Sequence, residues 1–529
     1  MKRLLLPALS AFLCALFSCK KPGTDSRPYL KSDSTTLTLG GYPGALDSFT
    51  VRASLSWKAS TSASWLSLSD TLTGGEKKIF LRALEINATG ADRTATINIQ
   101  PVDQPDIAPL TLQVRQRAFS LGILFNKTFG FDRHDYFSSM ALTPDGGLVL
   151  TGELYRTDPQ DGQYADKEVP LLKLNAQGMV QWQRAFGDGQ FDGGRAVLAT
   201  PEGGYAVAGT TGVNNGNTNG RKGMSDFWMV KTDALGNPQW EKILGGSSFE
   251  QASCLALTPD GGYVLAGYTY SNDGDVTGKH GSTGMMDMWV VRLDSRGNLI
   301  WQKALGGSGH EEAHSVIAVP GGYLVAGSSS SGDGDVSPVK GVSDGWVVKL
   351  SESGSILWEK TFGGTGLEKI FCIAPTADRN FILAGYSSSA DGEFAGGKGA
   401  GTYNGWVLKM DGSGNKLWQK TFGGTEWDEF RSVAAAPDGG FLLSGVSESG
   451  DGDLPANKGM KDNWVVKLGA SGQLLWQRSL GGGGNDYGYL VLPAADGAVW
   501  LGGGSWSDNG DVPGNKGGQD AWLLKLQEQ

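Results

Sequence analysis

The sequence predicts an all-β protein in two parts, a small β-sandwich followed by a β-propeller of seven four-stranded blades. Three observations support this fold class. The 529 residues include 82 glycines and 17 tryptophans and only 19% are charged, which is typical of a folded, turn-rich chain. Residues 29–118 alternate apolar and polar side chains in short runs. From residue 121 onward the chain repeats itself about every 60 residues.

Each repeat divides into four strands joined by glycine turns. In the fourth unit the runs "EEAHSVIAV", "YLVAGSS", "GWVVKLSE" and "SILWEKTFG" are separated by tight turns and one long loop. A meander of this kind cannot bury both faces by itself, so neighbouring units must stack. The tryptophan on the fourth strand recurs at spacings of 57 to 61 residues, at Trp182, Trp240, Trp301, Trp358, Trp418 and Trp476.

The two ends of the repeat region predict that the row of units closes into a ring. The last unit stops after its third strand. Residues 121–130, "LGILFNKTFG", align with the fourth strand "GNLIWQKALG" at 297–306, with Phe125 in the tryptophan position. We therefore expect this N-terminal strand to complete the last blade, which removes exposed sheet edges. Seven units result, beginning at Gly130, Gly187, Gly245, Gly306, Gly363, Gly423 and Gly481.

The first residues have the layout of a secretion signal. Lys2 and Arg3 precede an apolar stretch that is too short for a membrane span and ends in "LFSC", which resembles a bacterial lipobox. That resemblance implies a lipoprotein signal peptide at 1–18, lipid attachment to Cys19 and a tether at 19–28. It places the protein in the cell envelope, on the periplasmic or surface face of the outer membrane. The alternative is an ordinary secretion signal cut elsewhere.

The stretches "LSWKASTSASWLSLS", "ALEINATGADRTATINI" and "LTLQVRQ" resemble a BACON domain, with Trp57, Trp65, Asn87 and Arg93 at the expected positions. The resemblance implies an immunoglobulin-like sandwich over 29–118, found at the N-terminus of surface and glycan-handling proteins of Bacteroidota and proposed to bind carbohydrate or mucin. Trp57 and Trp65 are accordingly candidate sugar-stacking residues. The alternative is that both rings lie in the core and that the module is a spacer.

The segment "VVKLSESGSILW" and its copies resemble the tryptophan-docking motif of quinoprotein-type propellers, in which a turn glycine and a tryptophan lock one blade onto the next. Trp358 follows Gly354 by four residues, as that motif requires. The repeats also resemble the glycine-rich "DGGYxxAG" propeller arrays of secreted Bacteroidota proteins. These resemblances imply the seven-bladed fold over 121–529 and carry no quinone chemistry with them.

The long loops of all units are expected on one side of the ring, so a ligand should meet that face. An acidic set lies there, one carboxylate five residues after each starting glycine. Two interpretations are open: a girdle of ion pairs or backbone-bound carboxylates that fixes the blade junctions, or an acidic ring around the channel mouth that collects a cation or a sugar. The acidic set comprises Asp135, Asp192, Glu250, Glu311, Glu368, Asp428 and Asp486.

The loops between second and third strands carry another acidic pattern, D-G-D. Two oxygens spaced by a glycine can begin a calcium loop, although the further acidic ligands of an EF-hand do not follow. The alternative is an Asx turn, in which the aspartate caps its own backbone and glycine supplies a positive φ. Calcium is the candidate cofactor, and its candidate ligands are Asp273, Asp275, Asp333, Asp335, Asp391, Glu393, Asp451, Asp453 and Asp511.

Charge and motifs limit the function classes. A net charge of −10 argues against a nucleic-acid partner. The histidines form no zinc motif, and His310 and His314 are expected in a solvated polar loop. We expect a monomeric, non-catalytic, lipid-anchored envelope protein that presents its loop face to a glycan or protein ligand. Two alternatives are a propeller-type glycan hydrolase or lyase, whose carboxylate pair the sequence does not single out, and a protein-assembly scaffold of a surface complex.

Overall fold

The computed structural model describes residues 28–87, 89–130, 134–155, 167–187, 192–212, 221–394, 402–454 and 457–529. Its regular elements are strands, apart from one short 3-10 helix η1 (Gly392–Phe394), so the prediction of an all-β chain is confirmed. The chain forms two compact units, one ending at Phe119 and the other beginning at Ser120. The signal peptide, Cys19 and the tether up to residue 27 lie outside the described residues. The described part contains no apolar helix of membrane-spanning length.

The first unit contains two sheets with an apolar core between them. The burial pattern of its strands alternates, as in "TLQVRQ" at the end of β9, because each strand turns one face to that core. One sheet has the order β1 (Leu30–Ser32), β3 (Leu46–Ala53), β7 (Lys77–Ala83), β5 (Leu66–Leu68). The other has the order β2 (Thr36–Leu39), β9 (Leu110–Gln116), β8 (Arg93–Pro101), β4 (Ser56–Thr61), β6 (Leu72–Gly74).

The four residues that carry the BACON resemblance hold this first unit together. Trp57 is 0% exposed and Trp65 is 8% exposed, with the Arg93 guanidinium 4.7 Å from the centre of the Trp65 ring. The buried Asn87 side-chain amide donates to the carbonyl oxygens of Ala91, Gln116 and Arg117. The sugar-stacking role considered for Trp57 and Trp65 is therefore wrong for this structure, because neither ring offers a face to a ligand.

The described residues of the second unit form seven four-stranded antiparallel sheets. The first four are β11 (Tyr136–Leu142), β12 (Leu148–Tyr155), β13 (Lys167–Leu174), β14 (Val180–Phe186); β15 (Gly193–Ala199), β16 (Tyr205–Gly212), β17 (Ser225–Thr232), β18 (Pro238–Leu244); β19 (Glu250–Leu257), β20 (Tyr263–Thr269), β21 (Asp287–Leu293), β22 (Leu299–Leu305); and β23 (Glu311–Val319), β24 (Gly322–Ser329), β25 (Asp344–Leu350), β26 (Ile356–Phe362). The other three are β27 (Glu368–Pro375), β28 (Phe381–Ser387), β29 (Asn404–Met410), β30 (Lys416–Phe422); β31 (Asp428–Ala435), β32 (Phe441–Ser447), β33 (Asp462–Leu468), β34 (Leu474–Leu480); and β35 (Asp486–Pro493), β36 (Val499–Ser505), β37 (Asp520–Glu528), β10 (Leu121–Phe129).

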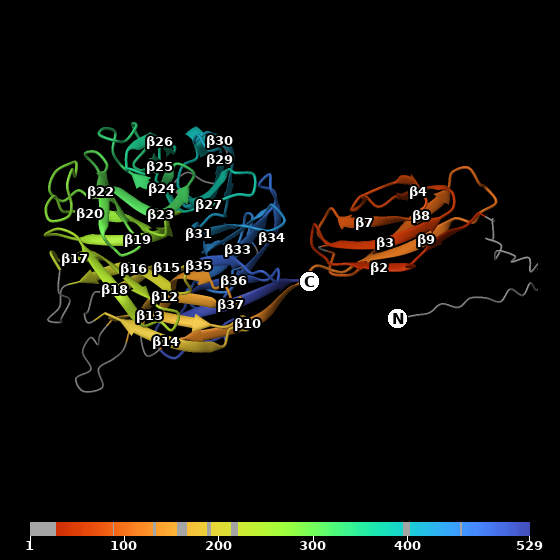
Figure 1. The fold of residues 1–529 in the computed structure, drawn as a ribbon, viewed down its shortest axis with the longest axis horizontal. Helices are drawn as coiled ribbons and strands as arrows, with labels where there is room; N and C mark the ends of the chain where they lie inside the picture. The colour runs from red at the N-terminus through yellow and green to blue at the C-terminus, as the bar shows by residue number, and fades with distance from the viewer. Residues whose placement is uncertain are drawn as a thin grey trace, which may run out of the picture. The chain divides into compact units, whose positions relative to one another are not determined.

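The sheets pack face to face in a propeller-like arrangement around a common centre (Figure 1). The first strand of each sheet contacts the first strand of the next, and β35 contacts β11, so these seven inner strands form a closed circuit. Middle strands such as β21, "DMWVVRL", are buried along their whole length because a neighbouring sheet covers each face. Val290 on β21, for example, shares an apolar cluster with Trp346 and Val348 on β25.

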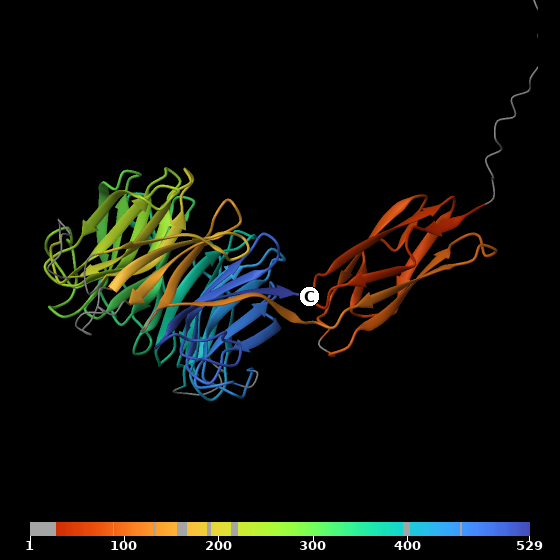
Figure 2. The ribbon, with the colours of Figure 1, turned by 90° about the horizontal axis from the view of Figure 1, so that it is seen from below.

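The N-terminal strand of this unit completes the last sheet. β10 pairs antiparallel with β37, with Thr128 opposite Trp522, and Figure 2 shows the orange N-terminal strand against the blue C-terminal strands. On the outer side, six of the seven fourth-strand aromatic rings pack on a turn glycine of the next sheet, and the seventh, Trp476, donates its indole Nε1 to Glu528 Oε1. A methyl group on Gly354, whose φ is 81°, would lie 3.0 Å from the Trp301 ring, and the indole Nε1 donates to the Glu352 carbonyl at 2.9 Å.

Candidate ligand-binding site

All seven inner strands carry a β-bulge at the same place. On β23, Ala313 pairs with Gly327 and Ser315 pairs with Ala326, so His314 between them has no partner in the ladder. The glycine on the second strand permits this close backbone approach, because a Cβ on Gly327 would lie 1.8 Å from the Glu312 carbonyl oxygen. A bulge redirects the side chain of the extra residue. The bulged residues are Ser138, Arg195, Ser253, His314, Phe371, Arg431 and Tyr489.

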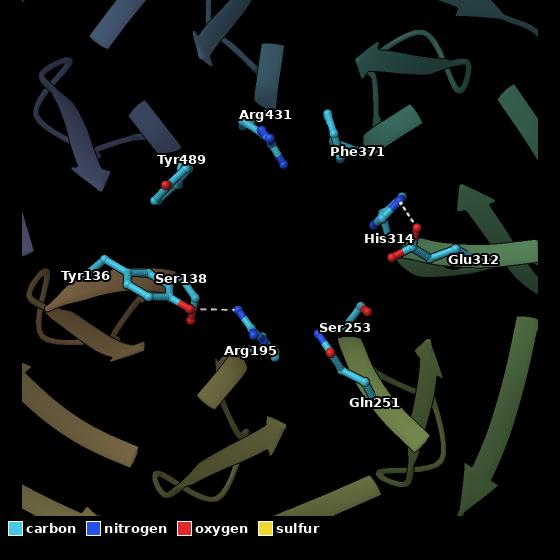
Figure 3. A pocket seen from close by; sticks show the side chains of 10 residues that line it. All are labelled: Tyr136, Ser138, Arg195, Gln251, Ser253, Glu312, His314, Phe371, Arg431 and Tyr489. Atoms are coloured by element: carbon cyan, nitrogen blue, oxygen red, sulfur yellow. Dashed lines mark hydrogen bonds and ion pairs between the residues drawn. The ribbon is translucent and has the colours of Figure 1, made fainter. Parts of the chain in front are cut away.

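The side chains of these seven bulged residues line one cavity of about 370 Å³ at the centre of the unit (Figure 3). Tyr136, Gln251 and Glu312, each two residues before a bulged position, complete its lining. Each bulged residue follows a member of the acidic set by three positions, so the cavity lies near the beginning of the inner strands, which the long loops precede. All seven sheets therefore contribute to one site.

Arg195 is held by a tyrosine and a buried glutamate. Its Nη1 donates to the Tyr136 hydroxyl at 2.9 Å, and its Nη2 lies 3.1 Å from Oε1 of Glu153. Burial raises the pKa of Tyr136, so the phenol stays neutral. Burial alone would lower the pKa of Arg195, but its interactions with Tyr136 and Glu153 outweigh burial and the pKa is raised. Arg195 is therefore a fixed cation at the cavity wall.

Arg431 occupies the corresponding position on β31 and is held in a different way. Its Nε donates to Oε1 of Glu429 at 2.6 Å, and the guanidinium lies 4.0 Å from the centre of the Phe371 ring. Within the described residues, Nη1 and Nη2 of Arg431 make no hydrogen bond to protein. In Figure 3 the guanidinium points toward the middle of the cavity. Arg431 thus offers the cavity a planar fork of N–H donors whose orientation is already set.

Glu312 contributes a carboxylate to the same cavity. Its Oε2 lies 3.4 Å from His314 Nε2 and 3.1 Å from Lys369 Nζ. Burial alone would raise the pKa of Glu312, but attraction to His314 and Lys369 outweighs burial and holds the pKa well below the usual range. Glu312 is therefore ionised at neutral pH. The cavity combines ionic and hydroxyl groups with the rings of Tyr136, Phe371 and Tyr489, which suits a polar ligand that also has apolar faces.

Aromatic rings continue from the cavity to the surface of the unit. The Tyr386 ring centre lies 5.7 Å from that of Phe371 and 6.2 Å from that of Trp427. Trp427 stacks on Tyr403 at 4.3 Å and 29°, with Lys461 Nζ 5.2 Å from its ring centre, and 36% of Trp427 is exposed. An exposed, supported indole of this kind can receive the flat face of a ligand.

The acidic set lies inside the blade junctions rather than in the cavity, since all seven carboxylate residues are 0% exposed. Glu250 is representative: its Oε2 accepts the Gly246 N–H at 2.8 Å, and its Oε1 accepts the Thr269 hydroxyl at 2.8 Å. A carboxylate with this burial cannot form a ring that solvent ions or sugars reach. The structure favours the backbone-bound interpretation of the acidic set.

The D-G-D residues also bind the protein's own backbone. Asp273 Oδ1 accepts the Ser247 N–H and Asp333 Oδ1 accepts the Ser308 N–H, both at 2.7 Å. Asp391 and Asp451 make the same contact to Thr365 and Thr425, and the neutral Asn509 makes it to Gly483. The second acidic residue of the D-G-D pattern forms an ion pair with a lysine in the corresponding loop of the preceding sheet. These pairs are Lys222–Asp275, Lys340–Glu393 and Lys458–Asp511. Within the described residues, no group of three or more His, Cys, Asp or Glu side chains is placed to hold a metal ion.

The sequence did not single out the cavity residues. His314 was expected in a solvated loop, but it lies on β23 with a side chain 15% exposed. Two signals were present in the sequence. The position eight residues after each starting glycine changes chemical class from unit to unit, whereas its neighbours repeat. A glycine also recurs inside every second strand, as in "YLVAG", where it indicates a bulge or a close backbone approach.

The chain was compared with known proteins, and no protein-family model matches it. The regulatory protein FlaEY of Caulobacter vibrioides is 25% identical over 186 residues, which cover 33% of this chain and only 19% of that protein. Among solved structures, a Bacteroides thetaiotaomicron protein of unknown function matches 96% of this chain and 99% of its own at 10% identity, with a TM-score of 0.36.

Two further structures are similar over parts of the chain. A GH5 xyloglucanase of Bacteroides ovatus, in complex with a heptasaccharide, matches 23% of this chain and 30% of its own at 18% identity, with a TM-score of 0.17. An apocarotenoid oxygenase of Synechocystis matches 73% and 87% at 15% identity, with a TM-score of 0.34. At these identities and scores the likenesses bear on neither the ligand nor the activity of this chain.

Proposed function

We propose that this protein is a lipid-anchored binding protein of the cell envelope whose central cavity holds the end of a glycan without cleaving it. In this proposal the second unit is a seven-bladed β-propeller and the first is a BACON-like, immunoglobulin-like sandwich that acts as a spacer. The lipid on Cys19 attaches the protein to the outer membrane.

The observation that carries the proposal is the ring of seven bulged residues around one cavity. The repeated scaffold would allow the same residue at every bulge, yet the ring presents two arginines, one histidine, two serines and two aromatic residues. Such asymmetry suits one asymmetric ligand at the axis. Hydroxyl, amide and guanidinium groups beside aromatic faces match the polar edges and apolar faces of a sugar ring.

Binding is preferred to hydrolysis because of the carboxylates. Glycoside hydrolysis in its usual form requires two carboxyl groups, one of them a proton donor. Among the ten described lining residues Glu312 is the carboxylate, and its lowered pKa makes it a poor proton donor at neutral pH. The scaffold alternative predicts a protein partner instead, and binding of none of the saccharides would favour it.

The test is calorimetric titration of the full-length protein with a panel of mono- and oligosaccharides. Ser253→Trp places a large side chain in the cavity wall, and Ser282→Trp makes the same change on an exposed loop as a control. We expect at least one saccharide to bind, Ser253→Trp to abolish that binding, and Ser282→Trp to leave it unchanged. Release of reducing sugar would support the hydrolase alternative, and a Ser253→Trp protein that binds as well as the parent would reject the cavity as the site.

A further inference from the structure

The basic side chains of the cavity lie on alternate sheets. Arg195 is on β15 in the second sheet, His314 on β23 in the fourth, and Arg431 on β31 in the sixth. Each has a glutamate partner, respectively Glu153, Glu312 and Glu429. Basic groups therefore approach the cavity from three directions (Figure 3), and each is paired with an acid.

The glutamates that hold the two arginines are buried more deeply than the arginines themselves. The side chains of Glu153 and Glu429 are 3% and 5% exposed, whereas those of Arg195 and Arg431 are 30% and 35% exposed. The acids therefore lie behind the guanidinium groups. The glutamates fix the orientation of the guanidinium groups, and the exposed sides of these groups face the cavity. This arrangement is preorganised to bind an anion.

The contacts that each arginine already makes identify Arg431 as the residue that can bind an anion. On Arg195, Nη1 donates to the Tyr136 hydroxyl and Nη2 forms an ion pair with Glu153 Oε1 at 3.1 Å, while Nε is buried without a hydrogen-bond partner among the described residues. Arg431 uses only Nε, toward Glu429, while its ring contact with Phe371 holds the plane of the guanidinium. The remaining Nη1 and Nη2 edge matches the two oxygens of a carboxylate, which guanidinium binds through two parallel hydrogen bonds.

The overall charge of the site favours a singly charged group. Three cations, Arg195, Arg431 and Lys369, stand beside three carboxylates, Glu153, Glu312 and Glu429. A carboxylate ligand adds one negative charge to this balanced set, whereas a phosphate dianion would add two. The rings of Phe371 and Tyr489 flank the Arg431 position in the cavity lining and can pack on a sugar face.

We propose that the ligand of this cavity is an acidic sugar, whose carboxylate is held bidentately by Nη1 and Nη2 of Arg431. This inference rests on the proposed glycan-binding function and deepens it by naming the class of sugar. Arg195 supports the bound anion by its charge, and Ser138 and Ser253 offer hydroxyl groups to the sugar.

The test is calorimetry on the full-length protein with matched pairs of sugars, glucuronate against glucose and galacturonate against galactose, together with N-acetylneuraminate and inorganic phosphate. We expect at least one acidic sugar to bind ten- to a hundredfold more tightly than its neutral counterpart, as expected for a charge-assisted pair of hydrogen bonds. Arg431→Gln should remove that preference, and Arg184→Gln, an exposed arginine outside the cavity, should preserve it.

The outcomes separate this inference from the proposed function. Equal binding of acidic and neutral sugars, blocked by Ser253→Trp, would overturn the carboxylate inference and leave glycan binding intact. Binding of phosphate with no sugar would overturn both, as would no binding at all. The comparison of acidic with neutral sugars uses the unmodified protein, so the inference is decided even if Arg431→Gln fails to fold.

Discussion

The guanidinium of Arg431 lies 4.0 Å from the centre of the Phe371 ring, and both are bulged residues of neighbouring inner strands, β31 and β27. Neither residue has a partner in its ladder, so cross-strand pairing does not constrain the choice of either side chain. The backbone around them repeats from unit to unit, while the chemistry of the cavity changes. A repeat scaffold can thus carry a single, asymmetric site.

Gly354→Ala should destabilise the second unit through the contact with Trp301. The substitution forces a residue with a Cβ to φ 81° and places that Cβ 3.0 Å from an indole that is itself hydrogen-bonded to Glu352. The left-handed backbone costs about 1–2 kcal/mol and the overpacking about 1–3 kcal/mol more. Chemical denaturation followed by tryptophan fluorescence measures the loss.

Gly261→Ala is the matched control, because Gly261 has φ 80° and open space around the added methyl group. Gly261→Ala should lower the free energy of unfolding by about 1–2 kcal/mol, which is the cost of the left-handed backbone alone. If Gly354→Ala and Gly261→Ala lost the same free energy of unfolding, the docking of Trp301 on the turn would contribute nothing measurable to stability.

The sequence predicts the elements of the second unit well because each depends on local composition. The alignment of residues 121–130 with a fourth strand anticipates the pairing of β10 with β37, and Gly354 and Trp301 meet as the docking motif implies. The cavity residues were missed for a physical reason. His314 shares the face of Glu312, two residues earlier, but that this face lines a central cavity depends on how the seven sheets pack, which "EEAHSVIAV" alone does not give. The burial of Trp57 could not be predicted either, because it requires the two sheets of the first unit to pack on each other and the local sequence does not determine that packing.

Stability should rise as the pH falls from about 7 toward mildly acidic values. Five third-strand or loop-end aspartates are buried, and burial raises the pKa of each carboxyl above its value in the unfolded chain. The folded protein therefore binds more protons than the unfolded chain in this range, and the cost of burying the charges is relieved as they are protonated. Carboxyls whose folded pKa is lowered, such as Glu312, Asp145 and Asp378, oppose this only at lower pH, below their ordinary pKa values of 4.5 for glutamate and 3.8 for aspartate. The five aspartates are Asp226, Asp287, Asp344, Asp462 and Asp520.

Asp344→Asn should raise the melting temperature at neutral pH and weaken its dependence on pH. Asp344 Oδ2 accepts the Lys340 N–H, which an amide oxygen can also do, and the chain has Asn404 at the equivalent position. The change removes a buried charge that repels Glu368. As a control, Asp411→Asn should bring no gain, because hydrogen bonds from Asn415 lower the pKa of Asp411. A melting temperature that falls for Asp344→Asn at neutral pH would contradict this account.

Asp333→Ala should lower the melting temperature equally with calcium and with a chelator. Asp333 Oδ1 accepts the Ser308 N–H, so its loss leaves the loop without that acceptor whether or not calcium is present. Thermal unfolding in excess CaCl₂ and in EDTA measures both conditions for the parent and the variant. A parent protein that melts several degrees higher in calcium, with the difference lost in Asp333→Ala, would restore the calcium-loop interpretation of D-G-D.

Trp427→Ala should weaken binding of an oligosaccharide and leave binding of the corresponding monosaccharide unchanged. Ring contacts link Trp427 through Tyr386 to Phe371 in the cavity wall, so a second sugar residue leaving the cavity can reach the exposed indole. Loss of one aromatic contact corresponds to about a two- to tenfold lower affinity. Trp506→Ala is the control, because Trp506 is 42% exposed and packs on His134. Calorimetry with the monosaccharide and the oligosaccharide measures both affinities. If Trp427→Ala also lowered the affinity for the monosaccharide, Trp427 would support the structure of the cavity itself. If it lowered neither affinity, Trp427 would not contact the ligand.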